Sequence, residues 1–273
     1  PCAHFGKTPP CADLIISCGI KQVVVGCRDP FPEVNGKGIE KLRAAGISVT
    51  TGVLENECKA INKAFFTFHT LKRPLIVLKW AQTADGFMSA KGQEDASQRV
   101  FISNAISNRL VHKWRSELAG ILIGTETALR DDPSLTTRLW EGRNPVRLVI
   151  DRTLRLPRHL KVFDQTVPTI VFNDTLSVTR DNLEYVDLEG ALNYPQAVCD
   201  VLYSKQINSI LIEGGTRLLQ SFISAGLWDE ARIITNRRSF LQDGNKAPIL
   251  PAGKLVTKEE YESDELTIVE NSD

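Results

Sequence analysis

An apolar segment of strand length, a glycine turn and a helical segment follow one another at several places along the chain. The pattern occurs in GILIGTETALRDDP at 120–133 and in INSILIEGGTRLLQSFISAG at 207–226. Apolar strands that alternate with helices are typical of a parallel sheet covered by helices. The chain is therefore predicted to have an α/β fold. Further strands are expected within 74–86, 145–151, 167–174 and 230–235, and a helix within 105–118.

The first 73 residues alternate in the same way on a smaller scale. The spacing of Leu54, Cys58, Ile61 and Phe65 predicts one helix across 54–72. The few strands expected here would form too small a sheet to be stable alone. This segment is therefore interpreted as the second half of a domain. Two domains are predicted, 1–73 and 74–273. Before residue 54, helices are expected at 12–19 and 38–46, and strands at 21–27 and 47–53.

The charge balance excludes a broad basic surface. Lys and Arg total 33 and so do Asp and Glu, which gives a formal net charge of zero and does not favour nucleic acid or an anionic membrane. No apolar run approaches the roughly 18 residues that a membrane-spanning helix needs, and no signal-peptide layout is seen. A cytoplasmic protein is predicted. Because Met88 is the only methionine, we expect the natural beginning to be missing.

The chain opens with PCAHFGKTPPC, in which Cys2 and Cys11 flank a proline-rich loop. Six cysteines over 273 residues are too sparse for a secreted disulfide scaffold, which leaves reduced thiols or metal ligands. Cys11 starts a predicted helix, where a thiolate is stabilised. Two thiolates could hold zinc if a third ligand joined them. The alternative is a pair of ordinary loop thiols.

This loop resembles the zinc loop of the cytidine-deaminase superfamily, and most closely the PCSHFGRTPPC loop of the riboflavin-biosynthesis deaminases. The resemblance implies that Cys2 and Cys11 bind zinc together with a histidine from an upstream H-A-E motif, whose glutamate shuttles the proton. No H-A-E motif occurs in this sequence. The third ligand is therefore expected upstream of Pro1, and the chain alone is not expected to deaminate. His4 is interpreted as a loop residue near the substrate.

The motifs KWAQTADG, ILIGTETALRDDPSLTTR, NPVRLVID and LIEGGTRLL resemble, in order, the reductase half of the same bifunctional riboflavin enzymes. The resemblance covers essentially the whole chain. It implies a partial cytidine-deaminase-like domain followed by a dihydrofolate-reductase-like α/β domain. It also implies NADPH as cofactor, phosphoribosylaminopyrimidine substrates and a homodimer. The choice of NADPH over NADH is not assigned to any basic residue.

The turn at Gly214 and Gly215 follows an apolar strand and precedes a helix, so bare amides could face a phosphate at the helix N-terminus. A structural turn explains such a sequence equally well. Several positions match cofactor-contacting positions of the reductase family. These are Ala81, Phe101, Thr127, Asp131, Gly215, Thr216, Arg217 and Leu218.

The family resemblance also implies a set of substrate residues. Arg115 and Arg138 are the candidates for the substrate phosphate, because guanidinium groups bind phosphate oxygens in pairs. Most helix arginines are simply solvated, and a Lys–Glu surface pair is common, so each has an ordinary alternative. The other predicted substrate residues are Lys79, Leu135 and Glu213. A serine that relatives place near the phosphate has no assigned counterpart, since Arg99 stands there with Ser97 nearby.

Asp131 is the candidate catalytic acid. Hydride delivery to the opened ribose needs a proton for the sugar oxygen, which a carboxyl group beside it could supply. The alternative is a helix-ending Asp-Asp-Pro turn. Three other functions fit parts of the sequence. They are a stand-alone reductase of another pterin or pyrimidine, a zinc-stabilised binding module without chemistry, and a nucleic-acid deaminase of the same superfamily.

Overall fold

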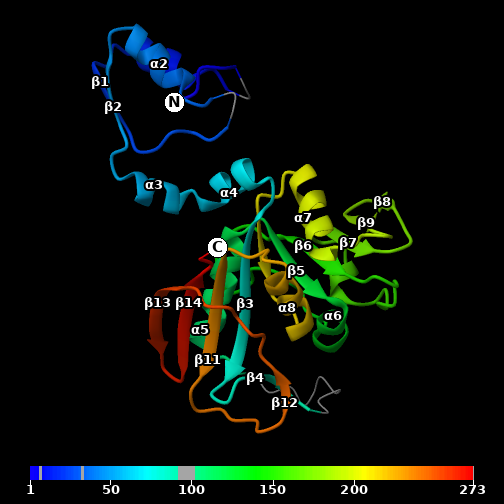
Figure 1. Ribbon diagram of the computed structural model, residues 1–273. Coiled ribbons are helices and arrows are strands. Elements are labelled where there is room, and N and C mark those ends of the chain that lie inside the picture. Colours follow the sequence, from blue (N-terminus) through cyan, green and yellow to red (C-terminus); the bar gives the residue numbers. More distant parts are fainter. Residues whose placement is uncertain (6–7, 32–33, 92–101, 273) are drawn as a thin grey trace. The chain divides into compact units, whose positions relative to one another are not determined.

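The computed structural model describes residues 1–5, 8–31, 34–91 and 102–272. They form two compact units, Pro1–Arg73 and Pro74–Asp273, here called the N-terminal and C-terminal units (Figure 1). No helix among the described residues is both long and apolar enough to cross a membrane.

The N-terminal unit contains two short parallel strands and four helices. Its small core consists of Ala12, Leu42 and Ile47. Glycines with positive φ follow the first two helices, Gly19 at 67° and Gly46 at 80°, as is common after helix C-termini. The elements are α1 (Cys11–Ser17), β1 (Gln22–Val25), α2 (Lys37–Ala44), β2 (Ser48–Thr51), α3 (Glu55–Ile61) and α4 (Lys63–Leu71).

The single helix predicted for 54–72 is wrong, because the chain breaks at Asn62 into α3 and α4. Asn62 leaves helical geometry, with φ at −114° and ψ at 22°. Its side-chain amide donates to the carbonyl of Cys58 at 2.9 Å. Short amide side chains compete with the helix backbone in this way, so apolar spacing alone overestimated the helix length.

The C-terminal unit is built on a ten-stranded mixed sheet in the order β13-β14-β11-β3-β10-β5-β6-β7-β9-β8. The strands from β11 to β9 are parallel, which confirms the α/β prediction. Its parallel strands are β3 (Leu75–Thr83), β5 (Gly120–Gly124), β6 (Val146–Ile150), β7 (Thr169–Asn173), β9 (Leu183–Asp187), β10 (Ser209–Ile212) and β11 (Glu230–Asn236).

Antiparallel strands complete both edges of this sheet. A C-terminal hairpin lies beside β11, drawn in red in Figure 1, and its pairing was not foreseen from the sequence. A separate two-stranded sheet joins two short strands that lie far apart in the sequence. The edge strands are β8 (Val178–Arg180), β13 (Lys254–Tyr261) and β14 (Asp264–Glu270), and the separate sheet pairs β4 (Phe87–Ala90) with β12 (Gly244–Lys246).

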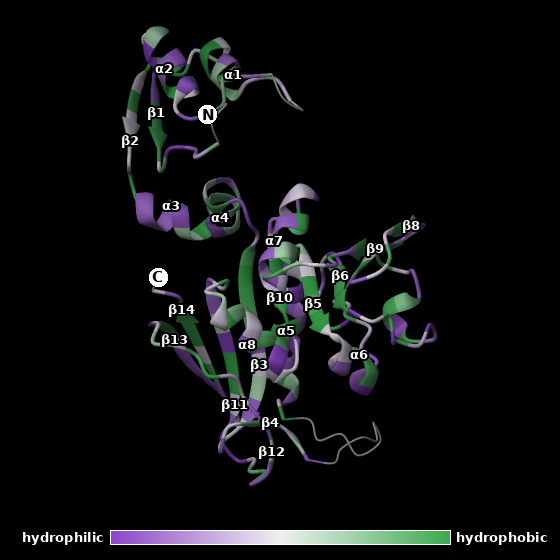
Figure 2. Cartoon of the chain, turned by 45° about the vertical axis from the view of Figure 1, so that its right-hand side comes forward, coloured by the Kyte–Doolittle hydropathy of each residue, from purple (hydrophilic) through white to green (hydrophobic). Residues whose placement is uncertain are grey.

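Helices cover both faces of the sheet. Residues alternate between faces, so Ile76 and Leu78 pack with α7 (Tyr194–Ser204) and α8 (Thr216–Ser224), while Val77 packs with α5 (Ala105–Glu117). The same face as α5 also carries α6 (Thr125–Asp131) and the 3-10 helix η2 (Lys161–Phe163). The apolar colour of the central strands β5 and β6 in Figure 2 reflects this burial on both sides.

Candidate functional site

A buried ion pair lies on the face of the sheet that α5 covers. Nε and Nη2 of Arg115 donate to the two carboxylate oxygens of Glu213, each at 2.8 Å. Each side chain is only 11% exposed. Arg115 comes from the last turn of α5, and Glu213 directly follows β10. The two parallel charge-assisted bonds fix the orientation of the guanidinium and of the carboxylate. Such fixed, planar groups can bind a planar ligand group with defined geometry.

The charge of Glu213 is stabilised by its neighbours. Burial alone would raise its pKa, but the positive charges of Arg115 and Lys79 outweigh it and lower the pKa to about 2. Lys79 lies on β3, where Leu78 is in register with Ile212, so Lys79 and Glu213 are adjacent on neighbouring strands. Glu213 is therefore a carboxylate near neutral pH and accepts hydrogen bonds rather than supplying protons.

The sequence reasoning missed a histidine in this group. His112 is 1% exposed and lies one helical turn before Arg115. Burial, followed by the positive charges of Arg115 and Arg138, lowers the pKa of His112 to about 4. The Leu139 backbone N–H donates to its Nδ1 at 3.5 Å. The i, i+3 spacing of His112 and Arg115 in VHKWR was the available signal for a shared helix face.

The segment after α6 contributes the remaining predicted substrate residues. Arg138 is exposed, and its effect on His112 places it at the rim of this charged group. Leu135 is buried, and its φ of 53° is uncommon for a side chain of its size. Arg115 donates through Nη1 to the Thr136 carbonyl at 3.3 Å. The structure thus brings Lys79, Arg115, Arg138 and Glu213 into one charged group, with Leu135 beside its anchoring segment.

The glycine turn lies at the carboxyl edge of the sheet, next to the charged group. The chain leaves β5 through α6 toward β6 and leaves the neighbouring β10 through α8 toward β11, on opposite sides. Ligands of open α/β sheets bind at such a topological switch point. Gly215 is the N-cap of α8, and among the described residues no side chain caps this helix.

Thr127, Gly215 and Leu218 lie together at this switch point. A Cβ on Gly215 would lie 3.6 Å from Thr127 Oγ1, and a Cβ on Gly214 would come within 2.6 Å of Leu218 Cδ2. Gly214 therefore has no space for a side chain, while Gly215 has room beside it. Thr216, the first residue of α8, donates its hydroxyl to the Lys246 carbonyl at 2.5 Å.

The other predicted cofactor residues take different positions. Arg217 is exposed on α8. Ala81 packs, partly buried, with the apolar cluster under α5. Asp131 is the last residue of α6, one helical turn beyond Thr127 and half-buried. Phe101, together with Ser97 and Arg99, lies outside the described residues.

Cys2 and Cys11 lie close together in the N-terminal unit. The backbone N–H of Cys11 donates to Cys2 Sγ at 3.3 Å, and this bond is the main cause of a lowered pKa for the Cys2 thiol. No group of three His, Cys, Asp or Glu side chains that could hold a metal is found in residues 1–5, 8–31, 34–91 and 102–272. A hollow in this unit is lined by Pro1, Cys27 and Phe65 among others, but Cys2 and Cys11 do not line it. The described residues thus provide two candidate zinc ligands and not a complete site.

A glycine turn at the switch point of an open α/β sheet, with buried charges beside it, is the kind of position at which α/β proteins bind their ligands. Residues 74–236 match the family model described as the RibD C-terminal domain. The chain belongs to the RibD family of riboflavin biosynthesis proteins.

Similar proteins support this assignment over the whole chain. The riboflavin biosynthesis protein RibD of Chlamydia trachomatis is 31% identical over 100% of the chain and 75% of its own length. That of Aquifex aeolicus is 39% identical over 84% of the chain and 65% of its own length. The chain thus spans roughly two thirds of such relatives.

A solved structure is similar over nearly the whole chain. It is the diaminohydroxyphosphoribosylaminopyrimidine deaminase/5-amino-6-(5-phosphoribosylamino)uracil reductase of Thermotoga maritima, at 34% identity. The TM-score is 0.88, over 99% of this chain and 77% of that one. The mixed α/β fold with a reductase-type domain, expected from the sequence, is confirmed.

Proposed function

We propose that the C-terminal unit reduces 5-amino-6-(5-phosphoribosylamino)uracil with NADPH, as a step of riboflavin biosynthesis. The observation that carries this proposal is the buried Arg115–Glu213 pair beside the glycine turn of α8. Relatives named as RibD, and the reductase named in the Thermotoga structure, support the substrate. A reductase of another pterin or pyrimidine is not favoured, because the similarity extends beyond the reductase domain to the whole chain.

The residues at the switch point fit a dinucleotide phosphate. The uncapped N-terminus of α8 offers backbone N–H groups, and Gly215 allows close approach of a ligand. Thr127, Leu218 and the exposed Arg217 border this position, and we propose that they and Thr216 hold NADPH together with Ala81 and Asp131. NADPH, when bound, supplies the hydride. Phe101 is proposed as a further cofactor contact from the family match alone.

The charged group fits a phosphorylated pyrimidine derivative. Arg138 is exposed at its rim and is the first candidate for the phosphate. Among the described residues, Arg115 uses three of its five N–H groups, on Glu213 and the Thr136 carbonyl, and we propose that the other two bind the ligand. Glu213 is an acceptor for pyrimidine N–H groups, with Lys79 beside it and Leu135 as an apolar contact.

We propose Asp131 as the proton donor to the ribose oxygen. Glu213 cannot take this role, since its pKa of about 2 keeps it ionised. Asp131 stands on α6 on the same helix face as Thr127, a proposed cofactor contact. An Asp131→Asn variant keeps the size and one acceptor oxygen of the side chain but has no acidic proton, so it is expected to retain NADPH binding and to lose turnover. Full turnover in that variant would refute the acid role.

The decisive experiment measures NADPH oxidation by the chain with 5-amino-6-(5-phosphoribosylamino)uracil. Wild type is expected to turn over, and Glu213→Gln to lose activity about a hundredfold, because one carboxylate oxygen becomes a donor NH2 group and the negative charge is lost. Glu260→Gln is the matched control, because Glu260 forms an exposed pair with Arg237. NADPH binding without turnover in wild type would refute the substrate, and absence of NADPH binding would refute the reductase itself.

For the N-terminal unit we propose that Cys2 and Cys11 belong to the zinc site of a partial cytidine-deaminase-like domain. The short Cys11–Cys2 contact and the lowered pKa of Cys2 support a metal-binding thiolate. A histidine ligand has to come from elsewhere, so no deamination step is assigned to these residues. Zinc analysis of the wild type and of Cys11→Ser tests this: equal zinc contents would refute the assignment.

We further propose that the protein acts in the cytoplasm as a homodimer, without nucleic acid or membrane partners. These proposals rest on the neutral charge and on the family resemblance. The mass in solution, measured by light scattering, tests the dimer: a monomer at all concentrations would contradict it.

A further inference from the structure

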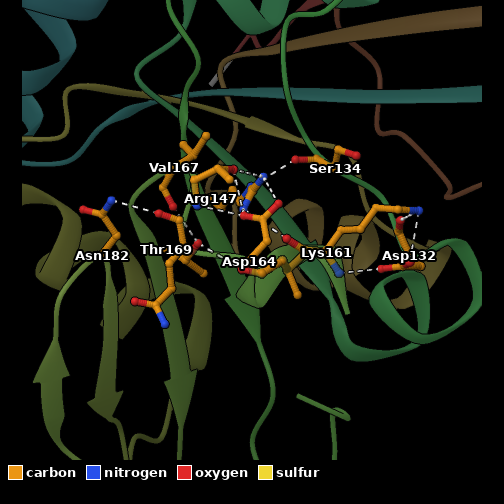
Figure 3. Close-up of polar contacts among 11 residues, drawn as sticks. Asp132, Ser134, Arg147, Lys161, Asp164, Val167, Thr169 and Asn182 are labelled. Carbon is orange, nitrogen blue, oxygen red and sulfur yellow. Dashed lines mark hydrogen bonds and ion pairs between the residues drawn. The ribbon is translucent and has the colours of Figure 1, made fainter. Parts of the chain in front are cut away.

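A second buried arginine, Arg147, anchors the segment that carries the proposed substrate residues. Arg147 lies on β6 and is 1% exposed. Its Nε donates to the Ser134 carbonyl at 3.0 Å, and its Nη1 donates to the Lys161 carbonyl at 3.1 Å (Figure 3). A buried guanidinium has five N–H donors, and each one left without an acceptor is costly.

Asp164 and Thr166 take the remaining donors. Asp164 accepts from Nη1 at 2.6 Å and from Nη2 at 3.4 Å, and Thr166 Oγ1 accepts from Nη2 at 3.3 Å. The bond from Arg147 is the main reason why the pKa of Asp164 falls to about 2. All five N–H groups of Arg147 are therefore used inside the protein, and none is left for a ligand.

The loop between α6 and β6 is fixed from two sides. Arg147 holds the Ser134 carbonyl and Arg115 holds the Thr136 carbonyl. Leu135 lies between these anchors, 2% exposed and with φ at 53°. A leucine keeps such a backbone conformation only where its surroundings impose it. The two arginines together supply that constraint.

The beginning of the same loop is tied to η2. The Lys161 backbone N–H donates to Asp132 Oδ1 at 2.7 Å, and Lys161 Nζ lies 3.0 Å from Asp132 Oδ2. Because the Lys161 carbonyl accepts from Arg147, the arginine is linked to the loop at Ser134 directly and at Asp132 through Lys161. Figure 3 shows Ser134, Lys161 and Asp132 together on one side of Arg147. Asp132 adjoins Asp131, the proposed acid.

We propose that Arg147 and Asp164 form a clasp that positions loop 131–138 for substrate binding, an inference that rests on the proposed reductase function. Arg147 is a positioning residue, because it is buried and all its donors are used. The clasp sets the backbone path before Leu135, while Arg115 holds the chain after it, and together they set the approach of Arg138 to the substrate. Among the described residues, the hydrogen bonds of Arg147 go to Ser134, Lys161, Asp164 and Thr166 and not to the glycine turn of α8, so cofactor binding is expected to be independent of the clasp.

Steady-state kinetics of Arg147→Lys and Asp164→Asn test this proposal. Lysine keeps the charge but cannot form the fork of bonds. The KM for 5-amino-6-(5-phosphoribosylamino)uracil is expected to rise about tenfold in both variants, with the Kd for NADPH unchanged. Asp164 is 37% exposed, so Asp164→Asn is expected to fold even if the arginine variant does not.

Val198→Ala is the matched control for lost stability. Val198 is fully buried on α7, on the opposite face of the sheet from the clasp. The KM of Val198→Ala for 5-amino-6-(5-phosphoribosylamino)uracil is expected to equal that of wild type. An unchanged KM in Asp164→Asn, or an equal rise in Val198→Ala, would overturn the clasp.

Hydrogen exchange separates failure of the clasp from failure of the proposed function. Peptides covering 131–139 are expected to exchange faster in Asp164→Asn than in wild type and Val198→Ala. This readout needs no turnover, so it judges the clasp even if the wild type fails to reduce the substrate. Equal exchange in all three proteins would refute the positioning role.

Discussion

Arg115 and Arg147 lie on the same face of the sheet and each pairs with a carboxylate, yet they differ in how their donors are used. Arg147 gives all five N–H groups to protein acceptors. Arg115 gives three and pairs with a carboxylate that is as buried as itself. Burial alone therefore does not separate the proposed ligand-binding arginine from the structural one; the number of donors without an acceptor among the described residues does.

The largest expected effect is on the free energy of unfolding when each arginine is removed. Arg115→Met leaves Glu213 buried without its main partner and should cost about 3–5 kcal/mol. The double variant Arg115→Met/Glu213→Leu should recover most of that loss, because neither partner of the buried pair remains and only one carbonyl, that of Thr136, loses its donor. Arg147→Met/Asp164→Leu should recover little, since the Ser134 and Lys161 carbonyls still lack their donor. Urea unfolding of Arg115→Met, Arg147→Met and the two double variants measures this, and equal recovery in both pairs would contradict the difference between the two arginines.

The pH dependence of stability tests the electrostatics around Arg115. His112 has a pKa of about 4 in the folded protein against an ordinary 6.5, because of burial and the nearby arginines. The unfolded chain thus takes up the proton first as pH falls, and stability is lost between pH 6.5 and 4, by at most about 3 kcal/mol. His112→Asn should flatten this slope, and His159→Asn, at an exposed position, should not. An unchanged slope in His112→Asn would contradict the shifted pKa.

Ligand binding should be separable from stability at the switch point. Gly215 has φ at −67° and space for a Cβ, so Gly215→Ala is expected to fold normally. The added methyl group should nevertheless raise the Kd for NADPH about tenfold by blocking close approach. Gly46→Ala is the counterpart: its φ of 80° should cost about 1 kcal/mol of stability, with NADPH binding unchanged. Isothermal titration and urea unfolding report the two quantities, and unaltered NADPH affinity in Gly215→Ala would argue against this site.

The smallest effect is expected at an exposed pair of similar geometry. Arg237 also donates two bonds to one carboxylate, that of Glu260, but its side chain is 41% exposed and that of Glu260 63%. Arg237→Met should change stability by less than about 1 kcal/mol, because water solvates the remaining charge. A loss as large as that of Arg115→Met would show that geometry, rather than burial, sets the energy of such pairs.

Helices and strands that have a local sequence signal could be predicted from the sequence. The apolar segments before Gly124 and Gly214 became β5 and β10, and α5 was expected within one residue of its observed end. The glycine turns after these strands can also be read in a short window, whereas the roles of the candidate residues beside them came from the family resemblance. The break at Asn62 was missed, since a single side-chain bond interrupts an otherwise helical pattern.

Only the tertiary structure decided which residues meet. Arg115 and Glu213 are 98 residues apart and pair because β10 returns to lie between β3 and β5. The same strand order sets Lys79 on β3 beside Glu213, and His112 on α5 lies close to the pair. The donors of Arg147 are likewise satisfied by loops before and after its strand. Periodicity reports each segment's own burial, whereas strand order and the satisfaction of buried charges depend on the whole fold.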